Sequence, residues 1–427
     1  MLADALDRTL LLMRTDLVPG VPSERLLSAL TSTSVVLVAG DDVLATHSGQ
    51  SAFVTAAMLM ARSGHSVWLE AEDVGLLGPQ PPLRLPTLTS ALRELGADLL
   101  PGWSFQKGPP PASVDLVVAF GGASFSGAPA HVLRLDADDW SAACGGGGAG
   151  WSGGEWPVGG LAAAALAAGE AFKAAMRDLR TAAACPPMFD ELYAPAADCT
   201  VALAPAGTRK ARRLGLFDIV SGGAIGNGVL HALLRMPDVT GAARVMDDDT
   251  SALSNLNRNA LLRRSRLDLA KVEDLASYSG GLEIVPIVHR YGSDDGSEPR
   301  LADTVLVGVD HIPSRWAAQR SDPEWLGIGA TERFFVQVSA HPRGEACAQC
   351  LHPEGSPPEG EIPTVAFVSY WAGLLLSVSL LRRCAADEAG PAERQAFFPA
   401  LRPEAWSAAW SSVAAREGCP TCSVMVA

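Results

Sequence analysis

The sequence predicts an α/β protein made of two similar doubly wound halves, and three observations carry that prediction. Runs of β-branched and aliphatic residues end in glycine at residues 34–40 and 216–228, which is typical of strands buried in a parallel sheet. Helical stretches separate the strand-like runs, so strands and helices alternate. The same order of elements occurs twice within 427 residues, a length that suggests two or three domains.

The elements of the first half can be placed in order from the hydrophobic pattern. We expect strands at 34–40, 66–70 and 114–122, and helices at 51–63 and 161–179. The glycine cluster at 145–160 predicts a flexible loop.

The second half repeats this order. It predicts strands at the start of 216–228 and at 243–249 and 304–311, with a helix at 364–383 that corresponds to 161–179. Residues 194–213 are rich in Ala and Pro and then basic, which predicts a linker. The interpretation is therefore two domains, residues 1–205 and 206–427.

Composition excludes several classes of protein. With 48% hydrophobic and 19% charged residues, the chain is not disordered. A net charge of −14 argues against a nucleic-acid partner. The N-terminus lacks the pattern of a signal peptide, and the longest apolar stretch, 365–381, contains polar residues and predicts a buried helix, not a membrane span. We expect a cytoplasmic protein.

A glycine turn follows the first strand of the second half. Gly223 and Gly226 have the spacing of the last two glycines of a nucleotide-binding turn, in which backbone N–H groups approach phosphate. Ser221 takes the first glycine position. The next strand ends in Asp247, Asp248 and Asp249, where an acid can accept the ribose hydroxyls. An NAD-binding protein would show the same features.

The residues that follow favour ATP over NAD. Arg258 lies in the segment 254–259 and Lys271 follows 13 residues later, and these cations can hold the phosphates of a triphosphate. Asp310 ends a buried strand, where a carboxylate can hold Mg²⁺, and Arg315 follows it. An NAD-dependent dehydrogenase does not need this pair of basic residues together with a second acid.

The eight cysteines include two Cys-x-x-Cys pairs separated by 68 residues. Four thiolates suit a closed tetrahedral zinc site, which is structural because no coordination position is left open. The predicted ligands are Cys347, Cys350, Cys419 and Cys422.

Taken together, these motifs resemble the ThiF/MoeB/HesA superfamily, the adenylation domains of ubiquitin-activating-type enzymes. The matching segments are SGGAIGN, MDDDTSALSNLNRN, Lys271, GVDHIPSR and the paired cysteines, in the family's order over roughly residues 214–427. His311 stands where the family commonly has Asn, and Asn259 where it has Gln.

The resemblance implies two Rossmann-like adenylation folds and a set of roles for the second. Asp247 would bind ribose, and Asp310 would serve Mg²⁺ and the reacting centre. The phosphates would be bound by Asp249, Asn255, Arg258 and Lys271. The implied cofactors are ATP, Mg²⁺ and Zn²⁺.

No cysteine occupies the position at which related enzymes form a thioester. That crossover region, residues 351–371, contains no cysteine, and the other cysteine of this half, Cys384, lies near a helix end. The enzyme could stop at the acyl-adenylate, use a distant cysteine (Cys144, Cys185 or Cys199), or form an oxyester. The hydroxyl candidates are Ser356, Thr364 and Ser369, and Thr364 is preferred because Ile362-Pro363-Thr364 resembles the stretch that carries the cysteine.

The first half keeps the strand and helix pattern but lacks these motifs, so the sequence predicts an inactive copy. In the family two such folds pack as a symmetric or pseudo-symmetric pair, and one can lend an arginine to the phosphates of the other. Arg14 is the candidate here. Alternatively, the first half binds the substrate.

The predicted function is ATP-dependent adenylation of the C-terminal carboxylate of a ubiquitin-like protein, in a bacterial ubiquitin-like conjugation pathway. The implied partners are the tail of that protein and a conjugating enzyme, with an internal pseudo-dimer and a possible homodimer. The alternatives are an adenylating enzyme for a modified peptide or a sulfur carrier, a non-catalytic scaffold, and an NAD-dependent enzyme.

Overall fold

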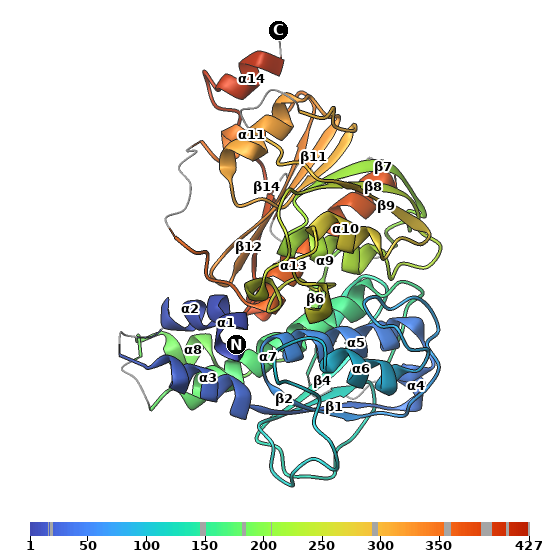
Figure 1. Ribbon diagram of the computed structural model, residues 1–427, viewed down its shortest axis with the longest axis vertical. Coiled ribbons are helices and arrows are strands. Elements are labelled where there is room, and N and C mark those ends of the chain that lie inside the picture. Colours follow the sequence, from blue (N-terminus) through green and yellow to red (C-terminus); the bar gives the residue numbers. More distant parts are fainter. Residues whose placement is uncertain are drawn as a thin grey trace.

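A computed structural model of the chain describes all residues except 16, 18–19, 146–150, 182–184, 206, 293–297, 354–359, 386–394, 407–409 and 426–427. It is a mixed α/β protein with two sheets, each mainly parallel at one side and antiparallel at the other (Figure 1).

Six strands form the first sheet: β1 (Ser34–Ala39), β2 (Ser66–Glu70), β3 (Leu116–Phe120), β4 (Val132–Ala137), β5 (Ser141–Cys144) and β6 (Cys199–Ala202). Their order is β2-β1-β3-β4-β5-β6. The first four in this order are parallel, whereas β5 and β6 pair antiparallel.

Eight strands form the second sheet: β7 (Arg213–Val220), β8 (Thr240–Met246), β9 (Leu282–Ile287), β10 (Thr304–Val307), β11 (Trp325–Glu332), β12 (Phe335–Pro342), β13 (Gln395–Pro399) and β14 (Trp410–Ser411). Their order is β9-β8-β7-β10-β11-β12-β13-β14. The neighbours from β9 to β11 are parallel, and the pairs from β11 to β14 are antiparallel. In strand order and direction, β2-β1-β3-β4-β5-β6 matches β8-β7-β10-β11-β12-β13.

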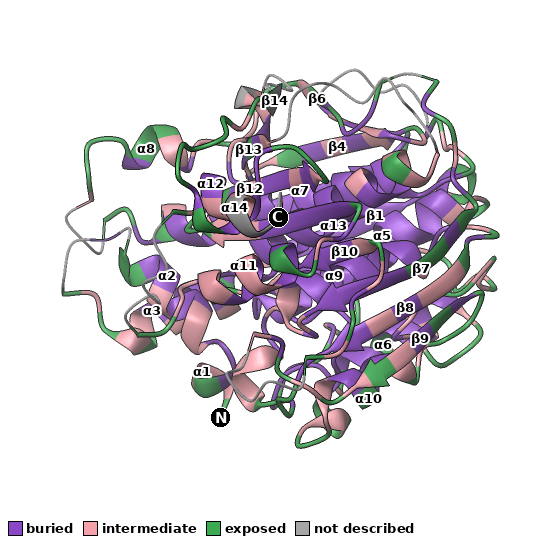
Figure 2. Cartoon of the chain, turned by 90° about the horizontal axis from the view of Figure 1, so that it is seen from above, coloured by how far each residue is buried: buried purple, intermediate pink, exposed green. Residues whose placement is uncertain are grey.

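A layer of helices lies between the two sheets (Figure 1). Its members are α5 (His47–Arg62), α7 (Val158–Asp178), α9 (Ala224–Leu233) and α13 (Ala366–Cys384). Helix α5 packs on α7, α9 packs on α13, and α13 contacts both α5 and α7. Most of this layer is buried (Figure 2).

The remaining helices lie around this framework: α1 (Leu2–Ala5), α2 (Asp7–Thr15), α3 (Ser23–Ser32), α4 (Asp41–Leu44), α6 (Leu88–Gly96), α8 (Phe189–Leu192), α10 (Lys271–Ala276), α11 (Ile312–Arg320), α12 (Ala348–Leu351) and α14 (Pro420–Met425). Short 3₁₀ turns occupy Leu253–Asn255, Arg264–Arg266 and Pro403–Ala405.

One hydrophobic core runs through both halves of the chain. Phe172 on α7 contacts Phe334 and Phe367 of the second half, with ring centroids 5.7 and 5.8 Å apart. Helix α7 is long and apolar enough to cross a membrane, but 94% of its most apolar window is buried in the protein. It is therefore accounted for as a core helix.

Three details of the predicted elements differ from the structure. The expected linker contains β6, which pairs with β5, and its last residue already belongs to β7. The expected loop at 145–160 ends in the buried Trp156 and the start of α7, although residues 146–150 lie outside the described residues. Helix α5 begins four residues early because the Thr46 side chain accepts a hydrogen bond from the Gly49 N–H.

The contact between α9 and α13 generates a stability prediction. A Cβ added at Gly373 would lie 2.6 Å from the Gly228 Cα, which is backbone that cannot rotate away. We expect Gly373→Ala to lower the free energy of unfolding by roughly 1–3 kcal/mol, measured by denaturant titration. Gly280→Ala is the control because open space surrounds that glycine. Equal stability of the two variants would contradict this packing.

Candidate functional site

A cavity of about 630 Å³ opens at the carboxyl ends of β7, β8 and β10. Parallel α/β sheets place ligand sites at this edge, and the volume lies within the usual range of ligand pockets, about 300–1,000 Å³. The cavity gathers nearly all the residues predicted to bind nucleotide: Gly223, Asp247, Asp249, Asn255, Arg258, Lys271 and Asp310.

The glycine turn forms the wall below β7. Ser221 has a φ of 96°, in the left-handed region that favours glycine, which explains why glycine is usual at this position. Its hydroxyl oxygen accepts a hydrogen bond from the Gly223 N–H at 3.0 Å and so stabilises the turn. Gly226 does not line the cavity but packs against the turn. A Cβ at this position would approach the Ser221 carbonyl oxygen to 2.2 Å, so the close contact requires glycine.

Asn227 ties this turn to the loop after β8, a role that sequence reasoning missed. Its amide nitrogen donates to the carbonyls of Gly222 and Gly223 at 2.8 and 3.1 Å. Its oxygen accepts from the Leu261 N–H at 3.2 Å. The only signal in the sequence was its place inside the SGGAIGN segment.

The acid at the end of β8 is held by backbone amides. The Asp247 carboxylate accepts from the Gly222 N–H at 2.9 Å and from the Asp249 N–H at 3.0 Å. Lys271, the first residue of α10, places its Nζ 2.5 Å from Asp249 and 3.4 Å from Asp247. These contacts confirm that the residues meet, and a nucleotide would compete with Asp249 for the ammonium group.

Arg258 lines the cavity and forms no salt bridge with any acidic side chain among the residues that the structure describes. Its guanidinium donates to the Ser254 carbonyl and, at 3.0 Å, to the Asn257 side chain. Burial, with the nearby Arg8 charge, lowers its pKa to about 10, so it is charged at neutral pH. A cation held by neutral acceptors beside a cavity is well placed to bind an anion.

The first half supplies a second arginine to this cavity. Arg8, on α2, lines the cavity, contacts Glu361 at 3.2 Å and donates to the Ile362 carbonyl at 3.4 Å. Arg14, the arginine singled out from the sequence, is instead hydrogen-bonded to Ser23 and does not line the cavity. Only the fold reveals Arg8, because it lines the same cavity as Arg258 although the two residues are 250 positions apart in the sequence.

Asp310 ends the loop after β10, with its side chain exposed at the cavity. Arg315 braces this loop from behind: its Nε and Nη2 donate to the Val309 carbonyl at 3.0 and 2.8 Å. His311 lines the cavity and pairs with the Ser314 hydroxyl at 2.9 Å. Asn255 accepts from the Ala252 N–H at 2.9 Å, which fixes its side chain at the rim.

The predicted acyl acceptor also lies on the cavity wall. Thr364 is buried, its N–H donates to the Arg8 carbonyl at 3.3 Å, and its hydroxyl is 3.0 Å from that of Ser369. A second hydroxyl is not a base, so these contacts supply no activating group. Ser356, the third hydroxyl candidate, lies outside the described residues.

The candidate distant cysteines do not line this cavity. Cys144 and Cys199 are opposed on β5 and β6, with sulfurs 2.9 Å apart, beside another cavity of about 450 Å³. Cys185 and Cys384 are partly buried elsewhere, and burial raises the pKa of Cys384.

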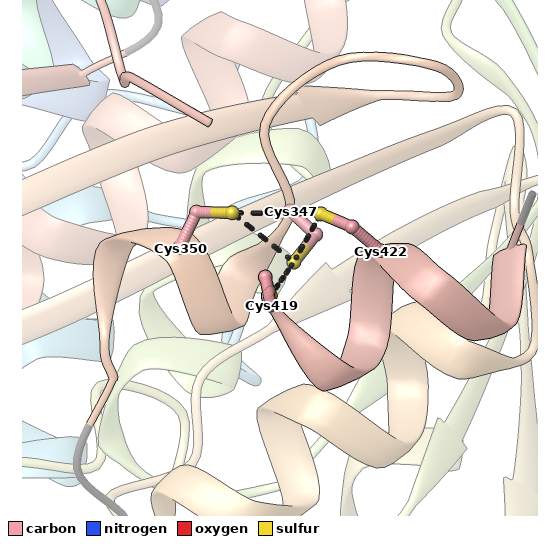
Figure 3. Close-up of side chains that lie close together, drawn as sticks. All are labelled: Cys347, Cys350, Cys419 and Cys422. Carbon is pink, nitrogen blue, oxygen red and sulfur yellow. Dashed lines mark hydrogen bonds between the residues drawn. The ribbon is translucent and has the colours of Figure 1, made fainter. Parts of the chain in front are cut away.

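The two Cys-x-x-Cys pairs converge as predicted (Figure 3). Cys347 immediately precedes α12 and Cys350 lies within it, whereas Cys419 immediately precedes α14 and Cys422 lies within it. Four of the sulfur–sulfur distances in the cluster lie between 3.3 and 3.7 Å. Four thiolates around Zn²⁺ would lie about 3.8 Å apart, so the cluster could hold a tetrahedral metal ion with little adjustment.

Comparisons with known proteins relate parts of the chain to others. Residues 34–188, less than half of the chain, match the family model described as the BilD N-terminal domain. The uncharacterized protein y4jF of Sinorhizobium fredii is 29% identical over 144 residues. That alignment covers 33% of this chain and 28% of y4jF, so the chain matches less than a third of the relative's length.

Among solved structures, the chain is similar to E. coli MccB. MccB with MccA-N7isoASN gives a TM-score of 0.38 and 17% identity, over 49% of this chain and 66% of MccB. MccB with SeMet MccA gives a TM-score of 0.39 and 14% identity, and the match covers 68% of this chain and 97% of the MccB chain. A further structure shows the microcin C7 biosynthetic enzyme MccB with N-formylated MccA. It gives a TM-score of 0.38 and 15% identity, and the match covers 49% of this chain and 67% of the MccB chain.

Proposed function

We propose that the chain is an E1-like adenylating enzyme that joins the C-terminal carboxylate of a small protein to AMP. The substrate carboxylate attacks the α-phosphorus of ATP, an acyl–phosphate bond forms, the bond to the β-phosphate oxygen breaks, and pyrophosphate leaves. The observation that supports this best is the single cavity that joins Asp247, Arg258, Lys271 and Asp310.

Each of these side chains has a role that follows from its place. Asp247, fixed by two backbone amides, presents oxygens suited to ribose hydroxyls. Arg258 and Lys271 bind phosphate oxygens, and Arg8 adds positive charge from the other side. Asp310 would hold Mg²⁺, which neutralises negative charge on the phosphates when bound.

We propose that the first half, residues 1–205, is a Rossmann-like adenylation fold without activity, and that residues 206–427 form the active one. The matching strand order of the two sheets supports this assignment. At the end of β3, which corresponds to β10, Gly121 is packed against Trp151 and Val43.

The substrate we favour is the tail of a ubiquitin-like protein, with a conjugating enzyme as a later partner, in the cytoplasm of a bacterium. Gly360, Glu361, Ile362, Thr364 and Ser369 line the cavity, so a tail can approach along this part of the crossover segment. A homodimer is compatible with the proposal but is not needed, because the first half already packs on the second.

Labelled pyrophosphate exchange tests the adenylation step. In the presence of a carrier protein we expect exchange into ATP, and we expect Lys271→Ala and Asp310→Ala each to lower its rate at least 100-fold, since each loses a charged contact to the phosphates or their metal. Lys107→Ala and Asp303→Ala, both at exposed positions, are matched controls that should stay near the parent rate. Exchange that survives in Lys271→Ala and Asp310→Ala would refute the site.

A covalent adduct test separates the possible acceptors. If Thr364 accepts the acyl group from the adenylate, AMP leaves and an oxyester forms that resists thiols but is cleaved by hydroxylamine. Mass spectrometry should then find it in the parent protein and in Ser369→Ala, and not in Thr364→Val. A thiol-labile adduct would identify a cysteine, and no adduct would indicate an enzyme that stops at the adenylate, as a peptide-adenylating enzyme does.

We also propose that the cysteine cluster holds one structural zinc ion per chain. Because four thiolates leave no open coordination position, zinc should stabilise the fold and take no part in the reaction. Metal analysis should find about one zinc in the parent and in Cys185→Ser, and less in Cys419→Ser, which should also unfold at a lower temperature. Zinc-free protein of unchanged stability would contradict this role.

A further inference from the structure

We propose that Arg62, in the first half of the chain, is a positioning residue for the nucleotide loop, defined as residues 252–263 of the second half. This inference rests on the proposed function, because that loop carries Asn255, Arg258 and Asn259, all of which line the cavity.

The contact is a three-point clamp. Arg62 is the last residue of α5 and is fully buried. Its Nη1 donates to the Leu256 carbonyl at 2.6 Å, and its Nη2 donates to the carbonyls of Ala260 and Leu262 at 2.9 and 2.7 Å. The clamped carbonyls therefore bracket Arg258 in the sequence.

The chemistry of the loop explains why the clamp is an arginine. Leu256, Ala260 and Leu262 are buried, and they follow the 3₁₀ turn at Leu253–Asn255 in a stretch without regular secondary structure, where buried carbonyl groups need donors. A guanidinium offers several N–H groups in a fixed planar fork, whereas a lysine is a flexible point charge. Burial lowers the pKa of Arg62 to about 9, so the group remains a cation at neutral pH and binds carbonyl dipoles strongly.

A second arginine makes the reverse contact. Arg235 lies two residues beyond α9, is buried, and its Nη2 donates to the Pro81 carbonyl at 2.6 Å. Pro81 lies between β2 and α6, in the first-half loop that corresponds in order to the segment after β8. Each half therefore sends an arginine from the end of its first sheet-covering helix into the loop of the other, as in a two-fold interface.

The two reciprocal arginine contacts allow a positioning role to be distinguished from a general contribution to stability. Both arginines bury the same group at the same interface, but only the loop held by Arg62 carries cavity residues. Because a small displacement of binding groups can reduce activity strongly, loss of the Arg62 clamp should affect nucleotide binding. Loss of the Arg235 contact should affect only the loop around Pro81.

Hydrogen exchange of the full chain tests the clamp without any assumption about activity. In Arg62→Lys, we expect amide exchange in residues 252–263 to speed up at least tenfold, with little change in residues 71–87. Arg235→Lys should give the opposite pattern. Uniform acceleration along the chain in both variants, or no change at residues 252–263 in Arg62→Lys, would overturn the clamp.

ATP affinity, measured by calorimetry with Mg²⁺ and ATP as the probe, tests the link to the nucleotide. Arg62→Lys should weaken binding at least tenfold and Arg235→Lys less than twofold. A loosened loop with unchanged affinity, or equal losses in the two variants, would overturn the positioning role. A parent protein whose loop responds to Arg62→Lys but which binds no ATP would instead refute the proposed function.

If Arg62→Lys does not fold, the parent protein still decides the matter. ATP should then slow exchange in residues 252–263 and leave residues 71–87 unchanged. ATP binding without that selective protection would overturn the inference.

Discussion

The whole arrangement depends on the burial of one helix layer between two sheets. Gly228 and Gly373 let α9 and α13 approach until their backbones touch, and α13 also packs on α5 and α7 of the other half. Interiors packed at this density transmit small displacements, since no free volume absorbs them. The loops at the edge of the second sheet are therefore fixed relative to the first half, although the first half provides few of the groups that line the cavity.

The cavity itself combines opposed charges in a way that suits a charged, metal-bound ligand. Arg8, Arg258 and Lys271 bring positive charge, while Asp247, Asp249 and Asp310 bring negative charge to the same wall. Lys271 is already paired with Asp249, but Arg258 is satisfied only by neutral acceptors among the contacts described. An anion could form direct hydrogen bonds with Arg258, and a cation could bind the carboxylate oxygens of Asp310.

Local patterns predicted much of this structure, and long-range contacts account for what they missed. Hydrophobic runs located β1, β7, β10 and α13 because burial on both faces leaves a continuous apolar signal. The cavity residues were predictable because the segments that carry them follow parallel strands, whose carboxyl ends meet at one edge of the sheet. Arg8 was not, since its approach to residues 360–364 depends on tertiary packing of α2. Strand β6, only four residues long, gave no periodic signal and was taken for a linker, and its place depends on pairing with β5.

Carrying both folds on one chain has a kinetic consequence for the site. In a dimer of separate subunits, an arginine such as Arg8 would reach the other cavity only at concentrations above the dissociation constant. Here one peptide chain joins the half that carries Arg8 to the half that forms most of the cavity. The effective concentration of Arg8 at the cavity is therefore fixed by this covalent connection and does not change on dilution. For the proposed adenylation, specific activity per molecule should accordingly be the same at nanomolar and micromolar protein. The join also frees the two halves of the chain from having identical sequences.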